Sequence, residues 1–287
     1  MINSVKILDT ISALLLTSLS GAALFCVSNA LAAAQGVTHE NYGGRTLLVY
    51  VPSRLPATGA RALVVVLHGG LGNAQRIESG QSENGLNMDV VAEKGGFVVA
   101  YLNGTPVTRF FGSDKLGWNA GGGCCGQPAE KNVDDVSYIK SAIDYLVGQY
   151  GIDRNRIFGI GHSNGAMMTQ RLMCETGIYA AAVPISGPLN LESGNCSAAS
   201  GKRILAVHGA EDENVPVAGG RGTKGISRTI FNSEERTRQT FTNAGASYNL
   251  QVVRGADHKL DHIEDAMQQA EGQSIAEKSA RFFGLLN

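Results

Sequence analysis

One segment near the middle of the chain constrains the fold more than any other. An apolar run at residues 156–160 ends in Gly-x-Ser-x-Gly at residues 161–165, and helix-forming residues follow at 166–173. A strand, a sharp turn and a helix in this order form a nucleophile elbow, in which the turn lifts a serine hydroxyl clear of the sheet. Glycines at both ends of the motif suit the close approach of strand and helix. A plain glycine-containing turn is the alternative, and the flanking pattern favours the elbow.

The elbow interpretation predicts a chemistry as well as a fold. We expect Ser163 to attack a carbonyl group and to form an acyl-enzyme that water releases, which makes the chain a hydrolase. With 287 residues and 43% hydrophobic content, the chain can bury the core of one α/β domain. A net charge of −1 gives no broad electrostatic basis for binding nucleic acid or anionic membranes, and small or polymeric organic substrates remain open.

The first 32 residues have the pattern of a cleaved signal peptide. Lys6 supplies a positive start, residues 11–27 are mostly apolar or small, and Ala-Leu-Ala at 30–32 is a small-x-small cleavage site. We therefore expect a signal peptide over 1–32, a catalytic domain over 33–287, and a secreted or periplasmic product.

Two alternatives for the leader are disfavoured. An uncleaved membrane anchor usually needs about 20 strongly apolar residues, and Ser, Thr and Gly interrupt this run. A lipid anchor on Cys26 is disfavoured because bulky Phe25 precedes it, where a small residue is expected. After cleavage we expect no stable membrane association.

Export changes how the remaining cysteines are interpreted. Cys124, Cys125, Cys174 and Cys196 form an even set in an oxidising compartment, which predicts two disulfides. A bridge between adjacent residues strains the backbone, so we expect Cys124 and Cys125 each to pair with Cys174 or Cys196. A metal site is disfavoured because adjacent cysteines lack the usual Cys-x-x-Cys spacing.

Hydrophobic periodicity predicts strands in alternation with helices along the mature chain. Such alternation is typical of a mainly parallel sheet covered by helices on both faces, the arrangement of an α/β-hydrolase fold. The expected strands are 45–51, 62–68, 97–102, 156–160, 180–185, 203–207 and 249–254, and the expected helices are 88–94, 134–150 with Asp134 as N-cap, 233–244 and 263–286.

Chain order selects the partners of the serine. In the α/β-hydrolase arrangement, an Asp or Glu follows a strand after the nucleophile, and a His follows the last strand. Strand 203–207 leads into a loop that contains Asp212, and strand 249–254 leads into a loop that contains His258. We therefore predict Asp212 as the acid and His258 as the base.

Three other residues compete for these roles. His262 also comes late enough in the chain, but we expect it to begin the closing helix, whereas His258 directly follows the last strand. Glu211 and Asp257 are alternative acids, and either also fits a solvated loop charge. His258 and His262 have the spacing of a helical metal site, but no Glu completes the zinc-protease pattern, so we expect no metal.

A glycine-rich loop after an early strand is the candidate oxyanion hole. Apolar residues 63–67 run into His-Gly-Gly-Leu-Gly at 68–72. The expected donors are the backbone amide of Asn164, the residue after the nucleophile, and an amide of Gly70 or Leu71. A glycine turn without this role is the alternative.

Several motifs together resemble the polyhydroxybutyrate-depolymerase-like esterase family, which includes feruloyl and acetylxylan esterases. The match spans essentially the whole mature chain. It implies a secreted carboxylic ester hydrolase with a triad of Ser163, Asp212 and His258 and no cofactor. The motifs are His-Gly-Gly at 68–70, Gly-Trp-Asn-Ala-Gly at 117–121 with Cys-Cys-Gly at 124–126, Val-Asp-Asp-Val at 133–136, Gly-His-Ser-Asn-Gly-Ala-Met-Met at 161–168, Met-Cys-Glu at 173–175 and His-Gly-Ala-Glu-Asp at 208–212.

Two departures from that family narrow the expected substrate. Members often carry a Gly-rich, Trp-containing stretch around the histidine, whereas residues 256–262 here read Ala-Asp-His-Lys-Leu-Asp-His. Extracellular polymer depolymerases tend to carry a linker and a surface-binding domain, which this sequence does not show. We therefore expect a soluble small-molecule or oligomeric ester rather than crystalline polyester.

Trp118 is the single tryptophan of the chain and a candidate substrate-binding residue. We expect it to wall the pocket and stack on an aromatic or sugar ring, with packing in the core as the alternative. Two other function classes remain open. One is an exported binding protein with this fold and no catalysis, and the other is a lipase or peptidase that uses the same triad.

Overall fold

The computed structural model describes residues 35–79, 85–108, 114–191, 195–224 and 229–287. It divides the chain into two units, 1–32 and 33–287. The leader expected over 1–32 lies outside the described residues. Within the described ranges, no helix has both the length and the apolar character that a membrane span requires.

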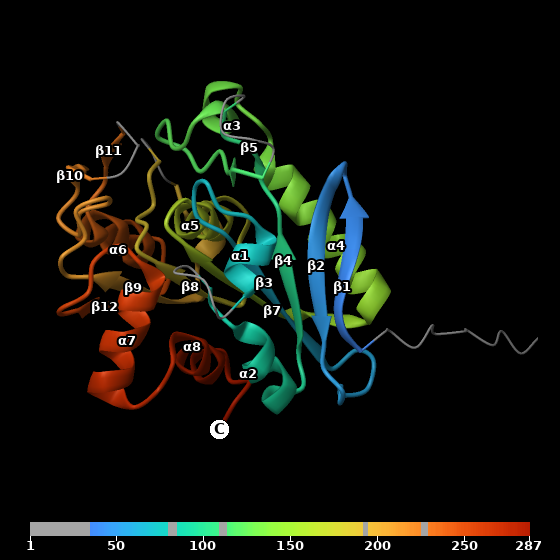
Figure 1. Ribbon diagram of the computed structural model, residues 1–287. Helices are drawn as coiled ribbons and strands as arrows, with labels where there is room; N and C mark the ends of the chain where they lie inside the picture. Colours follow the sequence, from blue (N-terminus) through green and yellow to red (C-terminus); the bar gives the residue numbers. More distant parts are fainter. Residues whose placement is uncertain (1–34, 80–84, 109–113, 192–194, 225–228) are drawn as a thin grey trace, which may run out of the picture. The chain divides into compact units, whose positions relative to one another are not determined.

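An eight-stranded sheet forms the centre of the second unit (Figure 1). The strand order is β1-β2-β4-β3-β7-β8-β9-β12, and all pairs from β4 to β12 are parallel, whereas β1 and β2 add two antiparallel pairs at one edge. These strands are β1 (Gly36–Tyr42), β2 (Arg45–Val51), β3 (Arg61–Leu67), β4 (Val98–Leu102), β7 (Ile152–His162), β8 (Ala181–Ile185), β9 (Arg203–Gly209) and β12 (Ser247–Val253); two small hairpins pair β5 (Thr105–Pro106) with β6 (Leu116–Gly117) and β10 (Gly220–Arg221) with β11 (Ile230–Phe231).

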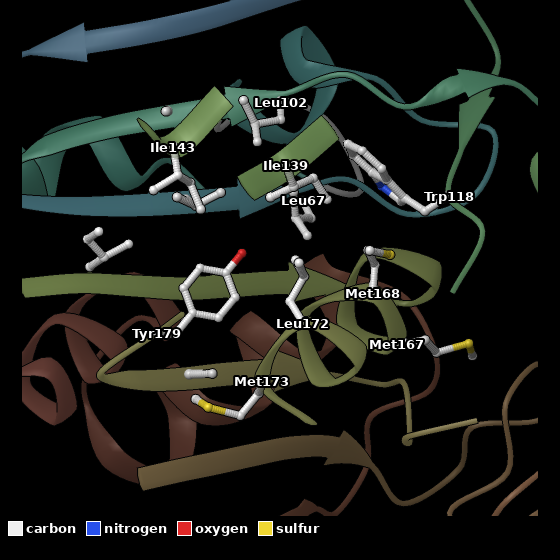
Figure 2. Close-up of a cluster of buried hydrophobic side chains, with 14 of the residues drawn as sticks. Leu67, Leu102, Trp118, Ile139, Ile143, Met167, Met168, Leu172, Met173 and Tyr179 are labelled. Atoms are coloured by element: carbon white, nitrogen blue, oxygen red, sulfur yellow. The ribbon is translucent and has the colours of Figure 1, made fainter. Parts of the chain in front are cut away.

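Helices cover both faces of the sheet because its central strands are apolar on both sides. Along β3, Leu63, Val65 and Leu67 belong to one core with residues of α4, α5 and α6, and Val64 and Val66 belong to a second core with residues of α1, α2, α7 and α8. Figure 2 shows part of the first core. The helices are α1 (Ala74–Glu78), α2 (Met88–Gly95), α3 (Gln127–Glu130), α4 (Asp135–Tyr150), α5 (Asn164–Thr176), α6 (Glu234–Asn243), α7 (Leu260–Glu271) and α8 (Ile275–Phe283), with a 3-10 turn η1 (Ser197–Ala199).

The predicted layered architecture is confirmed, and one predicted element is wrong. Each expected strand and helix overlaps an observed one, and Asp134 caps α4 by accepting from the Ser137 amide. The single closing helix expected over 263–286 is instead two helices, α7 and α8. Gly272 ends α7 with a φ of 69°, and Ser274 starts α8 with a capping box to Glu277, so local capping stops the helix that apolar periodicity alone would continue.

Parallel strands bring the loops of interest to one edge of the sheet. The carboxyl ends of β3, β7, β9 and β12 lead into the glycine-rich loop, the elbow, the acid loop and the histidine loop, respectively. Since β3 pairs with β7, and β9 with β12, these four loops gather at the carboxyl edge, where ligands of open α/β sheets bind.

Candidate active site

Ser163 occupies a strained backbone conformation between β7 and α5. Its φ is 56° and its ψ is −121°, a region that non-glycine residues rarely adopt. Hydrogen bonds on both sides hold it there: the Ser163 amide donates to the Ile185 carbonyl at 2.8 Å, and the Met167 amide donates to the Ser163 carbonyl at 3.0 Å. The strand, turn and helix of the expected elbow are therefore present.

The glycines of the motif are required by close backbone packing. A Cβ on Gly165 would overlap the carbonyl oxygens of Leu67 and His68, and a Cβ on Gly161 would overlap the Gly165 carbonyl. The glycine-rich loop presses on the same turn, since a Cβ on Gly69 would lie 3.3 Å from the Ser163 Cβ. Glycine at these positions therefore allows the turn to pack directly against the neighbouring backbone.

The structure brings Ser163, His258 and Asp212 together in a line. His258 Nε2 lies 2.9 Å from Ser163 Oγ, and His258 Nδ1 lies 2.7 Å from Asp212 Oδ2. The His258 side chain is 14% exposed, and the Asp212 side chain is fully buried. A hydroxyl, an imidazole and a buried carboxylate in this order have the geometry of proton transfer from the serine.

The Asp212 carboxylate is held at both oxygens. Oδ1 accepts from the amides of Asn214 at 2.9 Å and Val215 at 2.8 Å, and Oδ2 contacts His258 and, at 3.1 Å, His208 Nε2. Burial raises the pKa of Asp212, but the hydrogen bonds with His208 and His258 outweigh burial and hold that pKa well below its usual value. Asp212 is therefore an ionised acceptor with a fixed orientation.

The competing residues lie away from the serine contact. Glu211 is exposed. His262 is 46% exposed and pairs through Nδ1 with Asp257 at 2.9 Å, while Asp257 also accepts from the Lys259 amide. His262 lies in the first turn of α7, as expected from the sequence.

The backbone amides that the sequence offers as oxyanion donors are those of Asn164 and of Gly70 or Leu71, and Gly70 lies beside Asn164. A Cβ on Gly70 would lie 3.8 Å from the Asn164 Cβ. The Leu71 amide donates to the Leu116 carbonyl at 2.8 Å and is therefore occupied, whereas no acceptor in the described part of the chain takes the Gly70 or Asn164 amide. Of the two alternatives from the sequence, Gly70 is thus the one with a free donor.

The Trp118 side chain does not line a pocket. It is fully buried, its indole N–H donates to the His68 carbonyl at 2.9 Å, and it packs in the core near Leu67 and Met168 (Figure 2). The prediction that Trp118 stacks on a substrate ring is therefore wrong, because the side chain has no exposed surface. The packing alternative holds.

The Asn164 side chain ties the Trp118 loop to the elbow, a link that the sequence did not reveal. Its Oδ1 accepts from the Trp118 amide at 2.7 Å, and its Nδ2 donates to the Trp118 carbonyl at 3.1 Å. Nδ2 also lies 3.6 Å from Cys124 Sγ. The residue after the serine thus anchors the neighbouring loop through its side chain while its backbone amide stays free.

The disulfide pairing differs from the expected one. Cys124 pairs with its neighbour Cys125, and Cys174 pairs with Cys196. Cys124 belongs to the loop that contacts Asn164, the first residue of α5. Cys174 lies on α5 ten residues after Asn164, which is about 15 Å at the usual rise per residue. Cys124 therefore cannot reach Cys174, which instead faces η1, with Cα atoms 4.1 Å from Cys196.

His162 and His208 are buried, and the sequence predicted no role for either of them because neither follows the last strand. His162 Nε2 lies 2.8 Å from the carbonyl oxygen of His258 and so supports the loop that carries the histidine. Burial, followed by the nearby His258, lowers the pKa of His162 from 6.5 to about 3, so His162 is neutral and donates that hydrogen bond. His208 contacts Asp212 and Glu234 instead.

Among the described residues, no three His, Cys, Asp or Glu side chains gather in a way that could hold a metal ion. The polar groups of the site are those of a serine, histidine and carboxylate chemistry.

The sheet order and the turn after β7 define the class of protein. A mainly parallel eight-stranded sheet with helices on both faces and a serine on a strained strand-to-helix turn is the α/β-hydrolase fold. A carboxylesterase from Bacillus cereus shares it with a TM-score of 0.56 at 16% identity, covering 84% of this chain and 94% of that one. The poly(3-hydroxybutyrate) depolymerase LpqC from Bordetella parapertussis gives a TM-score of 0.53 at 15% identity, covering 86% and 95%.

Residues 54–263 match the phospholipase/carboxylesterase family, and the chain belongs to that family. Feruloyl esterase B from Piromyces equi is 29% identical over 180 residues, which are 61% of this chain and 31% of that relative. The chain spans less than half the length of the curated relatives it matches. The resemblance found in the sequence motifs is thereby confirmed.

Proposed function

We propose that the chain is a secreted serine carboxylic-ester hydrolase that acts through Ser163, His258 and Asp212. The observation that carries this proposal is the unbroken contact from Ser163 Oγ to His258 at 2.9 Å and from His258 to Asp212 at 2.7 Å. Membership of the phospholipase/carboxylesterase family supports an ester as the bond that is cleaved.

The geometry gives each group a role in the reaction. His258 Nε2 accepts the Ser163 proton as Oγ attacks the ester carbonyl, and Asp212 orients and stabilises the imidazolium that forms. The amides of Asn164 and Gly70 donate to the oxyanion of the tetrahedral intermediate. His258 then passes its proton to the leaving alcohol, and water repeats the sequence on the acyl-enzyme.

The proposed substrates are hydroxyalkanoate oligomers and short-acyl or feruloyl esters. Support comes from the names of relatives: a feruloyl esterase, a poly(3-hydroxybutyrate) depolymerase and an acetyl xylan esterase from Aspergillus awamori. Residues 1–32 are proposed to be a cleaved signal peptide and 33–287 the catalytic domain. The Cys174–Cys196 disulfide supports a secreted or periplasmic location, where such bonds persist.

Ser163→Ala tests the proposal. The wild-type protein is expected to hydrolyse part of a panel of acetyl, butyryl, hydroxybutyrate-oligomer and feruloyl esters, and the variant to lose at least about 10⁴-fold in kcat/KM with its melting temperature retained. Intact mass spectrometry after reaction with a fluorophosphonate should show one adduct on the wild type and none on the variant. Ser137→Ala, an exposed serine on α4, is the matched control and should keep both adduct and turnover.

Folded wild-type protein that neither hydrolyses any ester of the panel nor takes up the fluorophosphonate would overturn the proposal. Turnover that survives in Ser163→Ala would leave the esterase activity but remove Ser163 from it.

A further inference from the structure

A cluster of buried polar side chains that are not part of the triad contacts Asp212 through His208. Three elements contribute to it: His208 lies near the end of β9, Glu234 begins α6, and Tyr248 lies in β12. The His208 side chain is fully buried, and that of Glu234 is 2% exposed. Burying charged groups at this depth costs folding free energy unless they are paired, so we ask what this cluster does for the site.

Both ring nitrogens of His208 face acceptors. Nδ1 lies 2.8 Å from Glu234 Oε1, and Nε2 lies 3.1 Å from Asp212 Oδ2 and 2.8 Å from the Val215 carbonyl oxygen. A neutral imidazole carries one N–H and would turn a lone pair toward a carboxylate or a carbonyl. Only the imidazolium donates at both nitrogens, so contacts with two carboxylates and a carbonyl favour a buried cation.

The groups around this cation agree with its charge. Tyr248 Oη donates to Glu234 Oε2 at 2.8 Å, which gives the second oxygen of that carboxylate a donor. Burial lowers the pKa of His208, but the hydrogen bonds with Asp212 and Glu234 outweigh burial and raise it from 6.5 to about 9. Within the part of the chain that the structure describes, the histidines near His208 are His162, which is neutral, and His258, which shares Asp212 Oδ2.

We propose that His208, held as a cation by Glu234, is a positioning residue that fixes Asp212 and sets the pH at which activity is lost on the acid side. The inference rests on the proposed esterase mechanism. Asp212 Oδ2 lies between two imidazoles, 3.1 Å from His208 and 2.7 Å from His258. The fixed positive charge on His208 partly neutralises the carboxylate, so the carboxylate holds a proton on His258 less strongly.

Removing the cation has a signed consequence. Without it, the full negative charge of Asp212 faces His258 across the 2.7 Å contact, and the acid limb of kcat/KM is expected at higher pH. His208 and His258 both contact Asp212 Oδ2, at 3.1 Å and 2.7 Å. At the effective dielectric of protein sites, loss of a unit charge this close to His258 is expected to move the acid limb of kcat/KM upward by about one pH unit or more. A purely structural role for His208 would lower activity at all pH values without moving that limb.

The kinetic test compares His208→Gln with Tyr248→Phe. His208→Gln keeps a hydrogen-bond donor and removes the charge, so its acid limb is expected about one unit higher, with kcat reduced and KM retained. Tyr248→Phe disturbs the same cluster without changing a charge, and its limb should stay with the wild type. A His208→Gln limb that coincides with the wild type, or an equal displacement in Tyr248→Phe, would overturn the proposal.

A spectroscopic test observes the His208 ring directly in the wild-type protein and does not depend on turnover. In wild-type protein labelled with ¹⁵N on histidine, long-range ¹H–¹⁵N spectra at pH 7 should show protons on both nitrogens of His208 and on one nitrogen of His162. Glu234→Gln, which keeps an acceptor but not the charge, should release the His208 proton at a lower pH than the wild type. A neutral His208 ring in the wild type at pH 7 would refute the inference even if the esterase activity is established, and a protein that hydrolyses no ester would refute the proposed function whatever this spectrum shows.

Discussion

The elbow and the acid loop hold their side chains by different physical means. Around Ser163, position is set by shape: Gly161 and Gly165 let backbones touch, and neutral, buried His162 supports the facing histidine loop. Around Asp212, position is set by charge, since His208 and its partner carboxylate form a buried ionic cluster. We infer that substitutions which change volume should break the elbow, and substitutions or pH changes that alter charge should break the acid loop.

The largest effect is expected from adding one methyl group to the elbow. In Gly165→Ala, the new Cβ overlaps the backbone carbonyls of Leu67 and His68, and backbone cannot move aside as a flexible side chain can. We expect the variant to lose about 3 kcal/mol or more of unfolding free energy and nearly all ester turnover. Urea unfolding followed by circular dichroism, with kinetics on the folded fraction, measures both.

Gly148→Ala is the matched control for that substitution. Gly148 lies within α4, and nothing lies within 4 Å of a Cβ built on it. Here the same change should stabilise the fold by about 0.5 to 1 kcal/mol, because alanine favours the helix. If Gly165→Ala also folds with wild-type stability, close packing does not set the height of the elbow.

The difference between the two regions also explains what the sequence predicted. The elbow is local: one stretch of chain contains the strand, the glycines and the serine, so its form could be predicted from Gly161 to Gly165. Chain order alone was enough to predict Asp212 and His258, because the parallel strands that precede them end at one edge of the sheet. The central strands were found for the same reason, since their apolar runs are long and continuous.

The cluster behind Asp212 depends on contacts between distant parts of the chain, and here the sequence failed. Glu234 lies 26 residues after His208, at the start of a helix for which the sequence predicted no role in the site. The predicted disulfide pairing was wrong for the same reason, because it depends on where the loop with Cys124 meets α5, which is a contact between distant parts of the chain. Burial decided the role of Trp118, which residue type alone does not reveal.

A change of pH should lower the unfolding free energy through His208 on the alkaline side and through His162 on the acid side. The pKa of His208 is raised from 6.5 to about 9, so its contribution to stability is complete below pH 6.5 and is lost as the pH rises through 9. The pKa of His162 is lowered from 6.5 to about 3, so stability falls as the pH drops below 6.5 and the unfolded chain takes up the proton first. Unfolding free energies measured by urea titration from pH 4 to pH 10 should therefore decline on both sides.

His208→Gln isolates the alkaline decline. Between pH 7 and pH 9 the wild type is expected to lose about 2 kcal/mol through His208, and the variant should lack most of this slope while keeping the acid decline. A variant that declines on the alkaline side as steeply as the wild type would show that the acid loop is not held by charge.

The smallest effect is expected where the elbow meets the histidine loop, at the hydrogen bond from His162 to the His258 carbonyl. His162→Phe keeps a buried ring but removes the donor, so the carbonyl loses its 2.8 Å partner and the histidine loop its support. We expect a loss of about 1 kcal/mol in unfolding free energy and about tenfold in kcat, with KM unchanged, because the loop places the base and does not bind the ester. His162→Gln, which keeps an N–H donor, should recover most of both losses. Equal losses in the two variants would mean that ring packing, and not the hydrogen bond, links the elbow to the histidine loop.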